Sequence, residues 1–137
     1  DTLRNIKQTG EFCVNLVERS IAEHMNQTSF VFDSAVNELE VVGLTPLPCV
    51  KIKPSRVAES RVHLECKLFE IVSHGNGQGS ANYVIGEIVC IHIAENLLSE
   101  ETLTAHKYRP ISRMGGRDYL DTSSLEVFTM ERPQKPV

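Results

Sequence analysis

The first two residues of the chain, Asp1 and Thr2, have the chemistry to bind a phosphate. They precede a stretch that predicts a short helix. At such a position, free backbone N–H groups and the positive end of the helix dipole favour an anion, and the threonine hydroxyl adds a donor. A simple N-cap explains the same two residues, so both interpretations stay open.

A second candidate for ligand binding lies near the other end, in the segment Arg113-Met114-Gly115-Gly116 followed by Tyr119. Adjacent glycines let the backbone approach a flat ligand closely. An arginine can pair with a phosphate, and a tyrosine can stack on a ring. The alternative is a tight turn that leads into a last strand.

Two histidines and two cysteines, His63, Cys66, Cys90 and His92, are the types that bind zinc. Cys90 and His92 are two apart and share one face of a predicted strand, but His63 and Cys66 have opposite parity. We therefore expect no metal site from these four, and predict core thiols with surface histidines. No C-x-x-C pair occurs, and all four cysteines are expected to be reduced.

Other polar patterns carry less chemistry. The glycines at 75, 77 and 79 lie between two predicted strands, whereas a dinucleotide fingerprint lies between a strand and a helix. A basic stretch, Lys51 to Arg61, suits either a ligand phosphate or a solvated strand edge. No local Ser–His–Asp or Cys–His arrangement is present.

The elements that must position these residues follow from apolar periodicity and from glycine and proline. Strand patterns are strongest around the middle of the chain, where Gly86 indicates a bulge or a close approach to the backbone. In residues 61–72 we expect His63, Glu65 and Lys67 to point away from the apolar face. The predicted helices cover 2–9 (ending at Gly10), 18–27, 33–42 (ending at Gly43) and 99–108, and the predicted strands cover 11–17, 61–72, 83–93 and 125–130.

These elements predict a mainly β, α+β domain with short peripheral helices and antiparallel hairpins. With 137 residues, 41% of them hydrophobic, the chain has room for a single domain, residues 1–137. Three strong strands cannot cover a sheet, so a partner chain or further sequence must complete the core. A net charge of −4 argues against nucleic acid, and no apolar run is long enough to span a membrane.

Several segments, in order, resemble the flavin reductase family of FMN-binding split β-barrel proteins. The match begins with DTLRNIKQTGEFCVNLV and continues through KPSRVAESRVHLECKLFEIV, YVIGEIVCIHI and RMGGRDYL. It extends from Asp1 to about Tyr119. The resemblance implies an antiparallel split β-barrel that works as a cytoplasmic homodimer, with flavin bound between the subunits.

The family also implies FMN (or FAD) as cofactor, with NADH or NADPH as electron donor to flavin or to another acceptor. Hydride chemistry belongs to the flavin, which accounts for the lack of a local acid–base pair. A non-catalytic FMN-binding electron carrier or redox-sensing module is the alternative function, and a cofactor-free dimerisation module is a third. The cofactor-binding residues that the resemblance implies are Asp1, Thr2, Asn82, Arg113, Gly115, Gly116 and Tyr119.

Two departures from the family pattern affect these expectations. Asn82 stands near the position where many relatives carry a histidine that helps to place the nicotinamide, which puts pyridine-nucleotide use in question. The family's first strands, which cradle the flavin ring, have no counterpart ahead of Asp1. We therefore expect the chain to represent a domain without its N-terminal third.

Overall fold

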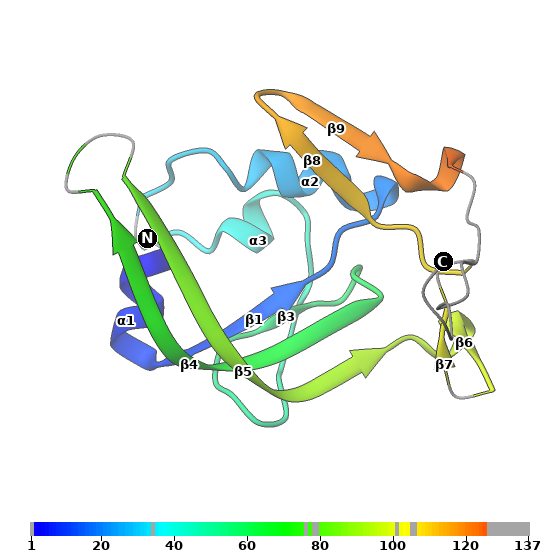
Figure 1. Cartoon of the computed structure of the whole chain (residues 1–137), viewed down its shortest axis with the longest axis horizontal. Coiled ribbons are helices and arrows are strands. Elements are labelled where there is room, and N and C mark those ends of the chain that lie inside the picture. The colour runs from blue at the N-terminus through cyan, green and yellow to red at the C-terminus, as the bar shows by residue number, and fades with distance from the viewer. Residues whose placement is uncertain are drawn as a thin grey trace, which may run out of the picture.

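A three-stranded antiparallel sheet forms the centre of the protein (Figure 1). The computed structural model describes residues 2–33, 35–75, 77, 80–100, 102–104 and 107–125. The sheet order is β1-β4-β5, with β1 at Glu11–Asn15, β4 at Val62–His74 and β5 at Ala81–Ile93. The two 13-residue strands β4 and β5 make one long hairpin. The predicted mainly β, antiparallel class is therefore confirmed.

Shorter elements surround this sheet. Three two-stranded antiparallel ladders pair β2 with β3, β6 with β7, and β8 with β9. Their strands are β2 (Pro46–Leu47), β3 (Arg56–Val57), β6 (Leu98–Ser99), β7 (Thr102–Leu103), β8 (Ile111–Gly115) and β9 (Asp118–Asp121). The helices are α1 (Thr2–Thr9), α2 (Ala22–Gln27) and α3 (Glu38–Val41), with 3-10 turns at Arg19–Ile21, Glu95–Leu97 and Thr122–Ser124. Among the described residues, no helix has both the length and the apolar character to cross a membrane.

The first helix ends where the sequence predicts. Ile6 is the buried residue of α1, and the N–H of Gly10 donates to the Ile6 carbonyl at 2.8 Å. Gly10 has φ +68°, a left-handed conformation that glycine adopts without a Cβ penalty. The Gly43 stop is likewise confirmed at φ +76°, but the helix before it is shorter than predicted, because only Glu38–Val41 are helical.

The predicted helix over 99–108 is wrong. The structure has β6 and β7 there, joined through Glu100, whose φ is +50°. Leu103 packs against the buried Leu97 and Tyr108, so tertiary packing overrides the local helical pattern. The 18–27 helix begins as a 3-10 turn and continues as α2. Of the strand predicted over 125–130, residues 126–130 lie outside the described residues, and Leu125 is in a bend.

The buried core is small. One cluster joins Val42, Leu44 and Val57, and a second joins Val62, Leu97 and Tyr108. Large apolar side chains on β4 and β5 remain exposed, with 75% of Phe69 and 63% of Tyr83 accessible; Ile85, Ile88 and Ile91 are also exposed. The described residues therefore leave much of the apolar surface of this hairpin uncovered.

Gly86 combines both roles that its position in a strand predicts. The β4–β5 register shifts between Leu68 and Glu70, directly opposite Gly86 and Ile85. A Cβ on Gly86 would lie 2.9 Å from Phe12 Cε1 and closer still to Cζ, and 3.2 Å from Cys66 Cβ. Strand β1 therefore packs its aromatic ring against the bare backbone of β5.

The prediction that His63 and Glu65 point to solvent is wrong. His63 is 5% exposed and Glu65 is fully buried, whereas Lys67 is exposed as predicted. Residues 50 and 51 lie over this face of the sheet, where their N–H groups bond to the Glu65 carboxylate. The alternating pattern identified the face correctly, but the covering loop comes from a distant part of the sequence.

Candidate functional site

A cavity of about 740 Å³ lies between α2 and the β8–β9 hairpin. In Figure 1 this hairpin lies above α2, at the end of the molecule away from α1. Three of the residues implied for cofactor binding line this cavity: Arg113, Gly116 and Tyr119. The full lining is Arg19, Ala22, Glu23, Met25, Asn26, Ser29, Ile111, Arg113, Gly116, Arg117, Tyr119 and Asp121.

The sequence folds into this hairpin because two glycines supply its turn. Gly115 has φ +111° and Gly116 has φ +56°, both in the region that side chains disfavour. Arg113 and Tyr119 are cross-strand partners, and the Arg113 Cζ atom lies 6.0 Å from the centre of the Tyr119 ring. The Arg113 Nη2 also donates to the Gly116 carbonyl at 3.1 Å. The turn thus holds a cation, an aromatic face and open backbone together at the cavity wall.

Hydrogen bonds join the hairpin to the rest of the domain at its base. The Ile111 N–H donates to the Val17 carbonyl at 2.9 Å, while the Thr122 hydroxyl links the two arms of the hairpin by donating to the Pro110 carbonyl at 2.6 Å. Beside them, Arg61 and the largely buried Glu18 form an ion pair, which raises the pKa of Arg61. These contacts fix the position of the Arg113 strand relative to α2.

The cavity wall has a small excess of positive charge. Three arginines (19, 113 and 117) and two carboxylates (Glu23 and Asp121) line it. Arg19 pairs with Glu23 at 3.6 Å, although both side chains are exposed, so this pair contributes little. Hydrogen bonds from Ser123 hold the pKa of Asp121 below its usual value, so this carboxylate stays charged at neutral pH. An anionic ligand with a flat ring matches this combination of groups.

Three other implied residues that the structure describes, Thr2, Asn82 and Gly115, are absent from the lining of this cavity. Thr2 borders a separate cavity of about 270 Å³ with Arg4, Asn5 and Asn37 among its lining. Asn82 is exposed near the end of the β4–β5 hairpin, and its Oδ1 accepts a hydrogen bond from the Ser73 hydroxyl at 2.8 Å. Asp1 lies outside the described residues. Within one copy, the α1 end and the β8–β9 hairpin are far apart (Figure 1).

Sequence reasoning missed several polar residues of the cavity, among them Arg19, Asn26 and Arg117. The signal for Arg117 was present, because it follows directly on the two glycines of the turn. Arg19 and Asn26 belong to a helical segment whose exposed face carries several polar residues, and nothing local distinguishes these two. Their role depends on the hairpin that folds over them from about ninety residues later.

Comparison with solved structures gives the class of the protein. The fold matches a putative flavin reductase with split barrel domain from Shewanella frigidimarina, with a TM-score of 0.74, 28% identity, and coverage of 95% of this chain and 65% of that one. It matches nitrilotriacetate monooxygenase component B from Bacillus cereus with a TM-score of 0.84, 30% identity, and coverage of 95% of this chain and 64% of that one. It also matches the 2-nitrobenzoate 2-nitroreductase NbaA from Pseudomonas fluorescens, with a TM-score of 0.83 and 32% identity over 100% of this chain and 67% of that one.

The family follows from the sequence comparison. The model of the flavin reductase like domain matches residues 1–112, and the chain belongs to the flavin reductase-like family. It is 33% identical to an uncharacterized protein of Halalkalibacterium halodurans and 32% identical to the uncharacterized protein YwrF of Bacillus subtilis, with 97% of this chain covered in both cases. It spans 64% and 66% of the lengths of these two relatives.

Proposed function

We propose that the chain is part of an FMN-dependent oxidoreductase that takes hydride from NADH or NADPH and passes electrons to free flavin or to another acceptor. The observation that carries this proposal is the family match over residues 1–112. Two similar solved structures point the same way, since one is a nitroreductase and the other a monooxygenase component. Membership in the family supports a flavin-related oxidoreductase activity, whereas the donor and the acceptor are part of the proposal.

The residues at the cavity between α2 and β8–β9 fit a flavin. Its volume of about 740 Å³ falls within the range of small-molecule pockets. Tyr119 is 41% exposed and offers a ring for stacking. Arg113 and Arg117 offer guanidinium groups to a phosphate or to an electron-rich ring edge. When bound, the flavin supplies the hydride chemistry.

The chain's own groups would bind and orient such a cofactor. Arg113 contacts the Tyr119 ring and the Gly116 carbonyl, so its side chain is already held in one conformation before a ligand binds. The left-handed turn at Gly115 and Gly116 leaves space where a Cβ would otherwise stand, and apart from the adjacent residues no atom of the described residues lies within 4 Å of that space at either glycine. A ligand ring can therefore approach this backbone closely.

We further propose that two copies of the chain complete each flavin site. Thr2 at the start of α1 and the β8–β9 hairpin occupy different ends of one copy, and both are implied in cofactor binding. A dimer that places the hairpin of one copy near the α1 end of the other would bring a phosphate site and a ring site together. The exposed apolar side chains of β4 and β5, such as Phe69 and Tyr83, are available for such an interface.

The direct test uses the purified full-length protein. We expect it to be yellow or to bind added FMN, and to bleach bound flavin when NADH or NADPH is added without oxygen. A colourless protein that takes up neither FMN nor FAD would refute the proposal. Sedimentation with bound FMN measures whether two chains and two flavins form the complex.

A matched pair of variants tests the cavity itself. Arg113→Gln removes a charge-assisted contact worth about 1.5–3 kcal/mol, so the Kd for FMN should rise about 10- to 100-fold. Lys107→Gln removes an exposed cation that is absent from this lining, and should leave the Kd unchanged. Equal affinities for the wild type and Arg113→Gln would exclude the cavity as the flavin site.

A non-catalytic electron carrier is the second candidate, and one residue favours it. Asn82 stands near the position where the family resemblance implies a nicotinamide-positioning histidine, and its amide oxygen accepts a hydrogen bond from the Ser73 hydroxyl. A carrier would still bind FMN, but NADH and NADPH would bleach the flavin no faster than they do in solution without the protein. Asn82→His would then be expected to introduce or accelerate that reaction.

A further inference from the structure

Outside the flavin site, one face of the central sheet brings thiol, imidazole and carboxylate groups together. Strand pairing places Cys13, Glu65 and Cys90 in one row across β1, β4 and β5. The next row on the same face contains His63 and His92, which are also cross-strand partners. These residues come from three strands, so their proximity is a product of the sheet register.

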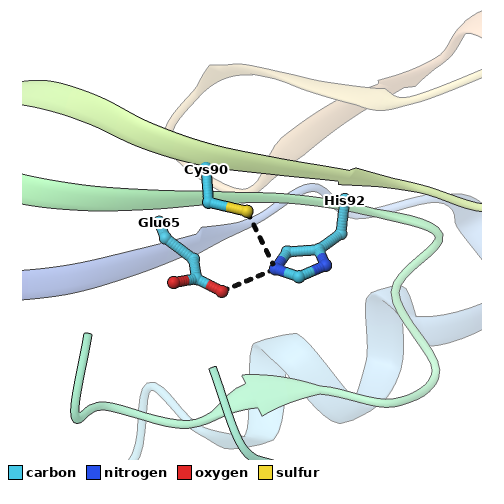
Figure 2. Close-up of side chains that lie close together, drawn as sticks. All are labelled: Glu65, Cys90 and His92. Carbon is cyan, nitrogen blue, oxygen red and sulfur yellow. Dashed lines mark hydrogen bonds and ion pairs between the residues drawn. The ribbon is translucent and has the colours of Figure 1, made fainter. Parts of the chain in front are cut away.

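Three of these side chains converge tightly (Figure 2). The Nε2 atom of His92 is 2.5 Å from Glu65 Oε1 and 3.6 Å from Cys90 Sγ. One ligand atom from each of Glu65, Cys90 and His92 lies within 4.8 Å of the other two. Glu65 is fully buried, and the His92 side chain is 19% exposed.

We propose that Glu65, Cys90 and His92 bind a thiophilic divalent cation of the Zn²⁺ type. Thiolate, imidazole and carboxylate are the three ligand types that zinc takes from proteins. A Zn²⁺ ion with one thiolate, one carboxylate and a neutral imidazole forms a group of zero net charge, which suits a buried position. Three protein ligands leave one coordination position for water or another ligand.

The spacing of the ligand atoms agrees with tetrahedral coordination. With bonds of about 2.3 Å to sulfur and about 2.0–2.1 Å to nitrogen, a tetrahedral ion separates its sulfur and nitrogen ligands by about 3.6 Å. The separation of Cys90 Sγ from His92 Nε2 is 3.6 Å. Coordination would widen the gap between His92 Nε2 and Glu65 Oε1 from 2.5 Å to about 3.3 Å, which a small rotation of the His92 ring supplies.

Backbone groups hold the carboxylate in place for this role. The N–H of Val50 donates to Glu65 Oε1 at 2.8 Å, and the N–H of Lys51 donates to Oε2 at 2.7 Å. Such outer contacts orient the ligands of metal sites. They also leave lone pairs on Oε1 for a cation, because each carboxylate oxygen accepts more than one bond.

A neighbouring histidine offers an unused nitrogen. His63 Nε2 is 2.8 Å from the Val57 carbonyl, so this nitrogen carries the proton and Nδ1 has a free lone pair. The Nδ1 atom is buried and has no hydrogen-bond partner among the described residues, and the centroids of the His63 and His92 rings are 5.9 Å apart. Both histidines line a cavity of about 460 Å³, which gives an ion and its water a path to the site.

The test is cobalt binding to the full-length protein, stripped of metal and kept reduced with a phosphine. We expect one Co²⁺ per chain and a thiolate-to-cobalt charge-transfer band in the difference spectrum. Cys90→Ala should remove the band and weaken binding by about 100-fold or more, because even outer contacts cost 10- to 100-fold. Cys66→Ala, which removes a neighbouring thiol outside the group, should keep both.

A second variant and a second readout keep the result decisive. His92→Gln should also weaken Co²⁺ binding. Any remaining thiolate-to-cobalt band should shift, because one of the ligands has changed. One equivalent of Zn²⁺ should raise the Tm of the wild type and of Cys66→Ala but not that of Cys90→Ala. No cobalt uptake by the wild type, or an unchanged band in Cys90→Ala, would overturn the proposal whatever the outcome of the flavin experiments.

Discussion

The contact between Phe12 and Gly86 allows a specific prediction for Gly86→Ala. The added Cβ would lie 2.9 Å from Phe12 Cε1 and 3.2 Å from Cys66 Cβ, whereas carbon atoms in contact prefer about 3.5–4.0 Å. Neither neighbour can move freely, because β1 and β5 both pair with β4. The Phe12 ring must therefore shift by about 1 Å or the strands must separate.

The magnitude follows from two opposing terms. Overpacking of this kind costs about 2–3 kcal/mol. Replacing glycine by alanine returns about 0.5–1 kcal/mol, because the unfolded chain loses conformational freedom. The net destabilisation is about 1–2.5 kcal/mol, which corresponds to a Tm decrease of roughly 3–9 °C for a domain of this size.

A double-mutant cycle, measured by urea and thermal unfolding of the full-length protein, tests the assignment. Phe12→Leu alone should cost about 1–2 kcal/mol, and Gly86→Ala added to it should cost little more. Gly77→Ala is the matched control, since among the described residues no atom lies within 4 Å of a Cβ there. Additive costs in the double mutant, or a Gly86→Ala protein as stable as Gly77→Ala, would refute the reasoning.

Three further predictions concern the buried carboxylate and the β8–β9 hairpin. Glu65→Gln should lower the free energy of unfolding by about 3 kcal/mol or more, because it removes a buried carboxylate that accepts hydrogen bonds from Val50 and other groups. The control is Glu59→Gln at an exposed carboxylate, which should lower it by less than about 1 kcal/mol. Burial would raise the pKa of Glu65, but its hydrogen bonds outweigh burial and lower the pKa to about 2, from 4.5. The stabilisation is thus present above about pH 4.5 and lost as the pH falls towards 2. With chelator present, the difference in the free energy of unfolding between wild type and Glu65→Gln should therefore shrink over that window. A constant difference would contradict the assignment. Gly116→Ala, at φ +56°, should destabilise the protein by about 1–2 kcal/mol in urea unfolding, and an unchanged midpoint would exclude the left-handed turn.

The sequence by itself determined the class of the domain and the order of its main elements. Gly10 and Gly43 end helices because a left-handed residue stops the α-helical hydrogen bonds, and this needs no distant partner. The long strands β4 and β5 follow from alternation and from β-branched residues over many positions. Periodicity also placed Cys90 and His92 on one face of β5.

Only the tertiary structure decided which segments pack against each face of these elements. Glu65 alternates like a solvent-facing residue, but residues 50 and 51 return across the sheet and bury it. The segment at 99–108 has a helical pattern, yet the packing of Leu103 against the core makes it a pair of short strands. In the same way, Arg113 and Tyr119 line a cavity together with α2 only because the β8–β9 hairpin folds over that helix. Local patterns encode which groups share a side of an element, whereas the groups that cover that side are set by contacts between segments far apart in the chain.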